Sequence, residues 1–172
     1  MSEFIIDRLL AARKNYPDAP FLVTQDAEIT YAQGWDIIDT IAACIEENDP
    51  SSPFIGILSE RGESAYYGTL ATIACGRSYV SLTAKNPNDR IQTMTKLAEI
   101  KTVLVGTGME KTFYECFADF PYPVLGISFD TPENTSNGNA QLIHYTSAKT
   151  DAPEKRHPKK TLPTSPMKIF AG

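Results

Sequence analysis

The chain has 172 residues, of which 42% are hydrophobic and 22% charged, enough for a hydrophobic core in one domain or part of a larger one. The net charge is −5, with +3 from Asp151 to the end, so the preceding part carries −8. An acidic body argues against a nucleic-acid-binding face. We therefore expect no nucleic-acid partner.

Cysteine and histidine usage limits the possible sites. The three cysteines, Cys44, Cys75 and Cys116, are odd in number and far apart in apolar surroundings, which predicts buried free thiols rather than disulfides or a zinc site. With two histidines, a histidine-based metal site is not expected. The N-terminus has charges every few residues, which is not typical of a signal peptide or a membrane span. We expect a cytoplasmic protein without a membrane partner.

The first elements are predicted from periodicity. A helix should run from Ser2 to Lys14, with an apolar side of Ile5, Ile6, Leu9 and Leu10. The runs FLVTQD (21–26) and EITYAQ (28–33) alternate and flank a turn, which predicts a β-hairpin. A second helix follows, with its apolar positions at helical spacing: Trp35, Ile38, Ile41, Ala42 and Ile45.

The chain then alternates between strands and helices. Strands are predicted at 54–59, 78–83, 101–106, 122–128 and 140–147. Three helices are predicted between these strands. The helix at 61–75 should end at Gly76 and turn five side chains inward: Tyr66, Tyr67, Leu70, Ile73 and Ala74. The next helix should be capped by Asn86 and bury Ile91, Met94, Leu97 and Ala98, and the last should span 109–120 with Phe113 and Phe117 inward. Repeated units of this kind predict an α/β fold, a mostly parallel sheet flanked by helices, with an N-terminal β-hairpin.

Composition changes after Thr150. Residues 151–172 are rich in proline and lysine without periodicity, which predicts a disordered basic tail following an α/β domain at 1–150. Its apolar end, Met167, Ile169 and Phe170, could either dock or fray. Contact of the basic tail with an acidic partner is a further possibility.

Several motifs resemble the N-terminal part of adenylate-forming (AMP-dependent) ligases, in the branch of nonribosomal peptide synthetase adenylation domains and D-alanine–carrier-protein ligases. The segment ITYAQGWDIIDTIAACI is similar to the family's L-T-Y-x-E-L segment and its helix. The segment IACGRSYVSLTAKNPNDRIQTM resembles K-A-G-x-A-Y-V-P-L-D…P-x-x-R-I, with matches at Gly76, Tyr79, Val80, Leu82, Pro87, Arg90 and Ile91. The resemblance covers Met1 to about Pro153, or about the first third of a complete ligase.

The stretch LIHYTSAKTDAPEK lies where the family has its phosphate loop, Y-T-S-G-S-T-G-x-P-K-G. Tyr145, Thr146, Ser147, Thr150 and Pro153 fall on that loop's positions. Ala148 and Asp151 replace its glycines, Lys149 replaces a serine or threonine, and Glu154 replaces its lysine. The resemblance implies a degenerate nucleotide phosphate loop formed by Tyr145, Thr146, Ser147, Ala148, Lys149 and Thr150.

These replacements disfavour nucleotide binding. An alanine where glycine adopts a positive φ costs about 1 kcal/mol or more, and each added carboxylate near a triphosphate costs about 1–4 kcal/mol. Lys149, or Lys155 with a one-residue shift, would recover part of the lost attraction. As simpler interpretations, the stretch is an ordinary strand-to-loop turn, Tyr79 and Arg90 are structural, and His144 faces solvent.

Three hypotheses follow. The first is a truncated, catalytically inactive adenylation-domain-like protein with no catalytic residues, metal or cofactor, serving as an interaction module and able to form a homodimer. The second is the N-terminal half of a split acyl-adenylating ligase, which would use ATP and Mg²⁺ with a complementing ligase fragment or a carrier protein. The third, a small nucleotide-binding protein using the sheet alone, would place its site at strand ends, and the nearest candidates are 59–62 and 106–108.

Overall fold

The computed structural model describes residues 5–24, 28–122, 124–129 and 142–146, with the side chains of 129 and 142–146 not described. The elements, in chain order, are α1 (Ile5–Asn15), β1 (Pro20–Val23), β2 (Glu28–Thr30), α2 (Tyr31–Asn48), β3 (Phe54–Leu58), α3 (Glu63–Ala74), β4 (Ser78–Ser81), α4 (Asn88–Leu97), β5 (Thr102–Val105), α5 (Glu110–Phe117), β6 (Leu125–Phe129) and β7 (Leu142–Thr146). The predicted loop at 130–139 and the tail at 151–172 lie outside the described residues.

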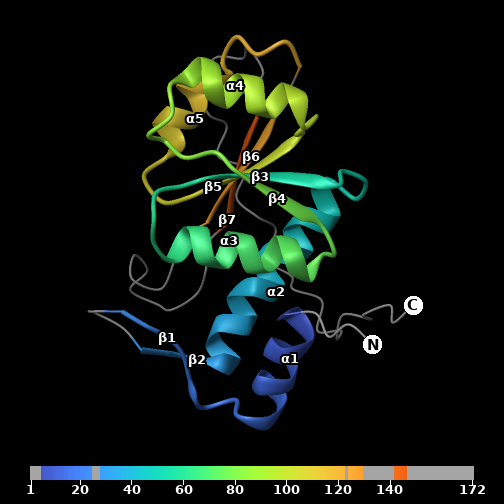
Figure 1. The fold of residues 1–172 in the computed structure, drawn as a ribbon, viewed down its shortest axis with the longest axis vertical. Helices are drawn as coiled ribbons and strands as arrows, with labels where there is room; N and C mark the ends of the chain where they lie inside the picture. The colour runs from blue at the N-terminus through green and yellow to red at the C-terminus, as the bar shows by residue number, and fades with distance from the viewer. Residues whose placement is uncertain (1–4, 25–27, 123, 130–141, 147–172) are drawn as a thin grey trace.

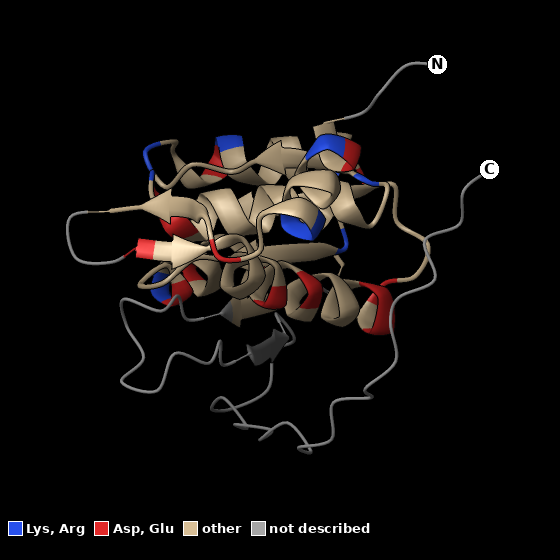
Figure 2. Cartoon of the chain, turned by 90° about the horizontal axis from the view of Figure 1, so that it is seen from below, with Lys and Arg blue, Asp and Glu red and all other residues tan. Residues whose placement is uncertain are grey.

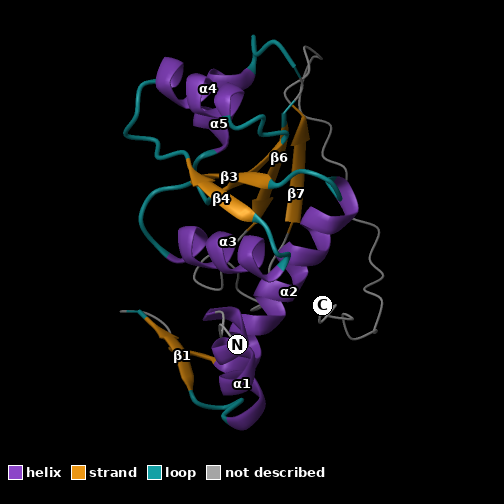
Figure 3. Cartoon of the chain, turned by 45° about the vertical axis from the view of Figure 1, so that its right-hand side comes forward, coloured by secondary structure: helices purple, strands orange, loops and turns teal. Residues whose placement is uncertain are grey.

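The predicted α/β class and the N-terminal hairpin are confirmed. Within the described residues the main sheet has five strands in the order β4-β3-β5-β6-β7, and β1 and β2 form a separate antiparallel pair (Figures 1 and 3). Strands β3, β4, β5 and β6 are parallel, whereas β7 pairs antiparallel with β6. The sheet is therefore mostly parallel with one antiparallel strand at an edge.

Helices cover both faces of this sheet (Figure 1). On one face, α2 and α3 pack on Ile55, Ile57, Leu104 and Ile127. On the other, α4 and α5 pack against a core that contains Leu58, Val103 and Val105. Alternation along β5 sends Val103 and Val105 to one core and Leu104 to the other, which is the two-sided burial typical of parallel sheets.

The first helix ends at Asn15, one residue beyond the predicted end, and lies outside the sheet layers (Figure 1). Its predicted cap, Ser2, lies outside the described residues. Ile6, Leu9 and Leu10 pack on the α2–α3 core, but Ile5 is 63% exposed, so the apolar side is narrower than predicted. Arg13 fixes α1 to α2 through a 3.0 Å contact between its Nη1 and the Asp39 carboxylate.

The second strand of the hairpin is shorter than predicted: β2 ends at Thr30, whereas the predicted strand ran to Gln33. Tyr31 to Gln33 belong to α2, because Thr30 is its N-cap: the Thr30 hydroxyl accepts a hydrogen bond from the Gln33 amide at 3.3 Å, and the Gln33 side chain accepts one from the Thr30 amide at 2.9 Å. This reciprocal pair is a capping box. The apolar positions predicted for this helix, from Trp35 to Ile45, are all buried.

Helices α3, α4 and α5 lie where they were predicted, but their first or last residues differ from the predicted ones. Helix α3 begins at Glu63, and Gly76 follows its end with φ 69°, a conformation that favours glycine. Helix α4 has Pro87 rather than Asn86 at its N-cap position, without a side-chain cap bond. Helix α5 spans only Glu110–Phe117, with Phe113 and Phe117 buried as predicted.

Two inward predictions were wrong. Leu97 is 82% exposed and Tyr66 is 39% exposed. Leu97 is the last residue of α4, where the chain turns through Glu99 at a positive φ of 51°, so it extends past the core that Ile91 fills. Tyr66 instead contacts the Phe21 ring of the hairpin at 5.7 Å between ring centroids.

Candidate functional site

The predicted phosphate loop begins at the end of β7. The backbones of Tyr145 and Thr146 form the last two positions of this strand, and in the register Gly126 faces Tyr145 and Leu125 faces Thr146. The other predicted loop residues, Ser147, Ala148, Lys149 and Thr150, lie outside the described residues, as does the substituted Asp151. The structure thus describes the backbone of only the first two residues of the predicted loop.

The antiparallel direction of β7 decides at which end of the sheet the loop begins. Leu125 pairs with Thr102 on one side and Thr146 on the other, and both Thr102 and Leu125 are the first residues of their strands. The end of β7 therefore lies where the parallel strands start. Nucleotide sites of open parallel sheets lie at the opposite end, beyond the carboxyl ends of the strands.

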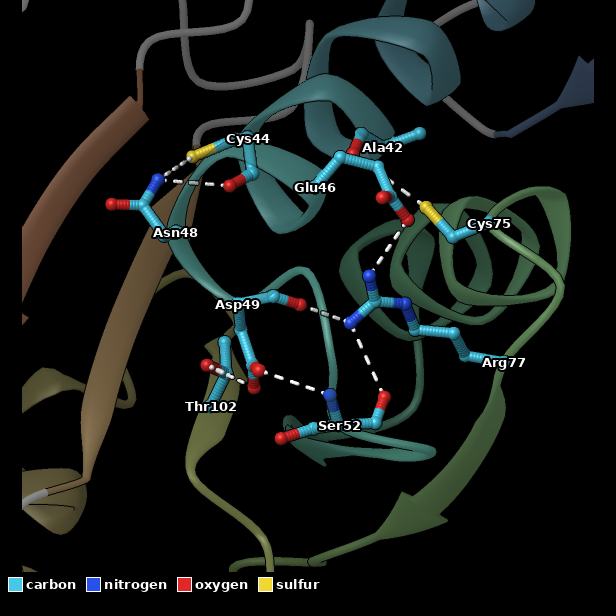
Figure 4. Close-up of polar contacts among 9 residues, drawn as sticks. All are labelled: Ala42, Cys44, Glu46, Asn48, Asp49, Ser52, Cys75, Arg77 and Thr102. Atoms are coloured by element: carbon cyan, nitrogen blue, oxygen red, sulfur yellow. Dashed lines mark hydrogen bonds and ion pairs between the residues drawn. The ribbon is translucent and has the colours of Figure 1, made fainter.

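A polar cluster that is buried except at Glu46 occupies the same amino-terminal end of the sheet (Figure 4). We call it the Arg77 cluster; it comprises Glu46, Asp49, Ser52, Arg77 and Thr102. The Arg77 guanidinium donates to the Glu46 carboxylate at 2.8 Å, to the Ser52 carbonyl at 3.2 Å and to the Asp49 carbonyl. These contacts bind the end of α2 and the loop before β3 to the residue that precedes β4.

The carboxylate of Asp49 links this loop to β5. It accepts a hydrogen bond from the Ser52 amide at 3.1 Å and one from the Thr102 hydroxyl at 3.0 Å. Burial alone would raise the pKa of Asp49, but the hydrogen bonds from Ser52 and Thr102, together with the charge of Arg77, outweigh it and lower the pKa of this carboxyl. Asp49 is therefore a fixed anion whose oxygens are already used.

The Arg77 cluster has the geometry of a structural joint. The Arg77 side chain is only 7% exposed and its donors are directed at protein oxygens, which satisfies carbonyls at the end of α2. No sequence motif predicted this joint, since Arg77 is 28 residues away from Asp49. The local signal was the spacing of Asp49 and Ser52, which is typical of a turn capped by an aspartate.

None of the three free cysteines, Cys44, Cys75 and Cys116, is a reactive thiol. Burial, followed by the charge of Glu47, raises the pKa of Cys44 to about 11, and burial, followed by the charge of Glu46, raises that of Cys75 to about 12. Burial also raises the pKa of Cys116 to about 11. These free thiols are protonated at neutral pH, so they are poor nucleophiles.

The opposite end of the sheet contains the two turns considered for a nucleotide. Gly106 packs so closely against the preceding turn that a Cβ added to it would lie 2.7 Å from the Ser59 Cβ and 3.1 Å from the Ser64 Cβ. The hydroxyls of Ser64 and Thr107 are 3.5 Å apart. Gly106 therefore serves close packing of the two turns against each other.

Three further residues considered from the sequence, Tyr79, Arg90 and His144, lie on different elements. Tyr79 is 47% exposed on β4. Arg90 is exposed on α4, and among the described residues no ion pair involves it. The backbone of His144 pairs with Ile127 in β7.

Metal clusters and membrane-spanning helices are absent from the described part of the chain. There, no three His, Cys, Asp or Glu side chains gather in an arrangement that could hold a metal ion. No helix among those residues has the length and apolarity required to cross a bilayer. Figure 2 shows Lys and Arg residues scattered singly among acidic ones in this view of the described chain.

The described fold is a mostly parallel sheet between two helical layers, with the antiparallel strand β7 at one edge. A family model described as AMP-binding enzyme matches residues 9–165. The chain belongs to this family of AMP-binding enzymes, which confirms the resemblance to adenylate-forming ligases.

Relatives agree with this assignment. Apicidin F synthase from Gibberella fujikuroi is 22% identical over 103 residues, which is 60% of this chain and 2% of that protein. Among solved structures, the nonribosomal peptide synthetase FmoA3 bound to α-methyl-L-serine-AMP has a TM-score of 0.58 at 17% identity, covering 83% of this chain and 18% of that chain. IdnL1 has a TM-score of 0.64 at 18% identity, covering 82% of this chain and 26% of its own.

A third solved structure is the Vibrio cholerae adenylation domain AlmE in complex with glycyl-adenosine-5′-phosphate. It has a TM-score of 0.60 at 20% identity and covers 69% of this chain and 23% of its own. At these identities the likeness shows the fold. The chain spans a quarter or less of most of these relatives.

Proposed function

We propose that this chain is an adenylation-domain-like protein that binds no ATP on its own and acts through contacts with other chains. The observation that carries the proposal is the composition of the loop after β7. Ala148 and Asp151 stand at the loop's glycine positions and Glu154 at its lysine position. These three residues change both the backbone freedom and the charge of a phosphate-binding loop.

The energies support loss of binding. A non-glycine residue held at positive φ costs about 1 kcal/mol or more. Asp151 and Glu154 each add a carboxylate, and a like-charge contact at about 4–6 Å costs on the order of 1–4 kcal/mol at an effective dielectric near 20. Replacing the lysine by Glu154 also removes an attraction of similar size.

The surroundings of the loop's first residues point the same way. Thr146 ends β7 in the row of Leu125 and Thr102, and Thr102 already donates to Asp49. The guanidinium of Arg77, the cation of the Arg77 cluster, is engaged by Glu46, Asp49 and Ser52. Recruiting it for a phosphate would leave the carbonyls at the end of α2 without their donor.

A binding measurement with a matched variant tests this proposal. The wild-type chain and the triple variant Ala148→Gly, Asp151→Gly, Glu154→Lys are titrated with a nonhydrolysable ATP analogue and Mg²⁺ by calorimetry. We expect no measurable heat for the wild type and an affinity higher by about a hundredfold or more for the variant. Equal binding by both chains, or crystallographic density for the analogue against residues 146–151 of the wild type, would contradict the proposal.

The alternative is one half of a split ligase. It is favoured by the share of the solved structures that the chain spans, 18% of FmoA3 and 26% of IdnL1. In this role a second polypeptide would complete the site, with ATP and Mg²⁺ as cofactors and a carrier protein as a further partner. Coexpression with a candidate fragment, followed by an ATP–pyrophosphate exchange assay, separates the two proposals, since exchange requires a working site.

A further inference from the structure

Strand β4 forms one edge of the main sheet and pairs only with β3 among the described strands. The Ser78 amide donates to the Pro53 carbonyl at 3.0 Å, and the Leu82 amide donates to the Ile57 carbonyl at 2.8 Å. Because successive residues of a strand alternate, Ser78, Val80 and Leu82 direct their backbone groups at β3. Tyr79 and Ser81 consequently direct theirs away from the sheet.

Among the described residues, this edge has none of the features that usually prevent pairing with another chain except its short length of four residues. The other features are charged side chains, proline, a bulge or a covering element. The sequence SYVS has no charge and no proline, and its register with β3 is regular over four residues. The neighbouring cation, Arg77, is directed back to Glu46 and to the Asp49 carbonyl at the end of α2. Among the described residues, no hydrogen bond involves the outward amides of Tyr79 and Ser81.

The two outward residues are placed symmetrically about Val80. If a second copy of the strand approaches antiparallel with a two-fold axis at Val80, Tyr79 of one copy faces Ser81 of the other, and the reverse. In an antiparallel ladder each such pair exchanges two N–H···O=C bonds, so all outward amides and carbonyls of Tyr79 and Ser81 are satisfied at once. The same surface is used on both copies, which closes the assembly as a dimer.

We propose that β4 is an interaction edge at which two copies of this chain pair antiparallel through Tyr79 and Ser81. The proposal names a partner for the interaction role proposed above. It depends on no nucleotide, so self-association and ATP binding can be measured separately and either can fail alone. A second copy fits best because the strand is uncharged and complementary to itself, so like-charge repulsion does not act within the pair.

Substitution of Ser81 by proline tests the pairing with little risk to the fold. The Ser81 amide points outward, so Ser81→Pro removes no bond to β3. Proline is also the residue that the Y-V-P-L-D motif quoted above has at this place. In a symmetric dimer the change removes two donors and places two rings in the interface. We expect at least about tenfold weaker association by analytical ultracentrifugation, with unchanged circular dichroism.

Leu97→Ser is the matched control. Leu97 is exposed beside Phe54, where the two side chains line an open hollow at the amino-terminal end of β3. The proposal expects Leu97→Ser to associate like the wild type. Loss of association in Leu97→Ser but not in Ser81→Pro would assign the interface to that hollow and overturn the proposal.

Amide hydrogen exchange gives a readout at single residues. At low protein concentration the amides of Val80 and Leu82 should be protected, whereas those of Tyr79 and Ser81 should exchange rapidly. Raising the concentration should protect Tyr79 and Ser81 in parallel with dimer formation. A wild-type chain that stays monomeric, or a dimer in which these two amides remain unprotected, would overturn the proposal.

Discussion

Strands β4 and β5 flank β3 on its two sides and pair with it in the same parallel direction, yet their surroundings differ. All four residues of β5, TVLV, are buried, whereas three of the four residues of β4, SYVS, are exposed. Strand β5 lies between β3 and β6 and contributes to both cores, while β4 has one neighbour among the described strands. The β5 side of the sheet should therefore contribute most to stability, whereas the β4 edge is the side that we propose for interaction.

The largest effect is expected on the β5 side. Leu104→Ala removes a fully buried side chain from the core under α2 and α3, and should lower the free energy of unfolding by about 3–4 kcal/mol. The matched change on β4 is Val80→Ala, where the half-buried side chain should cost about 1 kcal/mol. Urea unfolding followed by circular dichroism measures both, and equal losses would contradict the division between the two strands.

The next effect tests the joint that ties β4 to the rest of the chain. Arg77→Met keeps the length of the side chain but removes the donors to the buried Asp49 and Ser52 carbonyls, and should cost about 2–3 kcal/mol. Arg61→Met is the control: Arg61 is exposed, so a change within about 0.5 kcal/mol is expected. A similar loss in the two variants would mean that the Arg77 cluster contributes nothing specific.

The smallest effect concerns the link from the same joint to β5 and depends on pH. The pKa of Asp49 is lowered in the folded chain, so its contribution to stability is present above the unfolded pKa, about 3.9, and is lost as the pH falls through the folded pKa. Thr102→Val removes one of its donors and should cost about 1 kcal/mol at pH 7.

That cost should shrink as the pH falls through the folded pKa of Asp49, which lies below the usual value for an aspartate, because the carboxyl then becomes protonated in both proteins. Thermal unfolding of Thr102→Val and the wild type between pH 7 and about pH 2 measures the difference. A constant gap across this range would show that the hydrogen bond does not act through the charge of Asp49.

Part of the fold was predictable because it follows from local sequence patterns, such as the spacing of apolar residues and the position of glycine. The helical spacing from Trp35 to Ile45 identified a buried helix, and Gly76 marked the end of another through its positive φ. The exposure of Leu97 was not predictable, since spacing alone does not show where the packed length of a helix ends. For the candidate site, the motif predicts a phosphate loop that begins at Tyr145, and the structure shows at which end of the sheet strand β7 ends.

The sequence by itself determined the alternation of strands and helices, the hairpin and the family, because hydrophobic period, turn residues and short motifs are local properties of the chain. Only the tertiary structure decided the strand order, the antiparallel direction of β7, the place of β4 at an edge of the described sheet and the bond between Arg77 and the end of α2. The alternation of apolar residues along a strand indicates which side chains share a face, but it does not indicate which other strand will pair with it. The choice among neighbours is made by contacts between residues far apart in the chain.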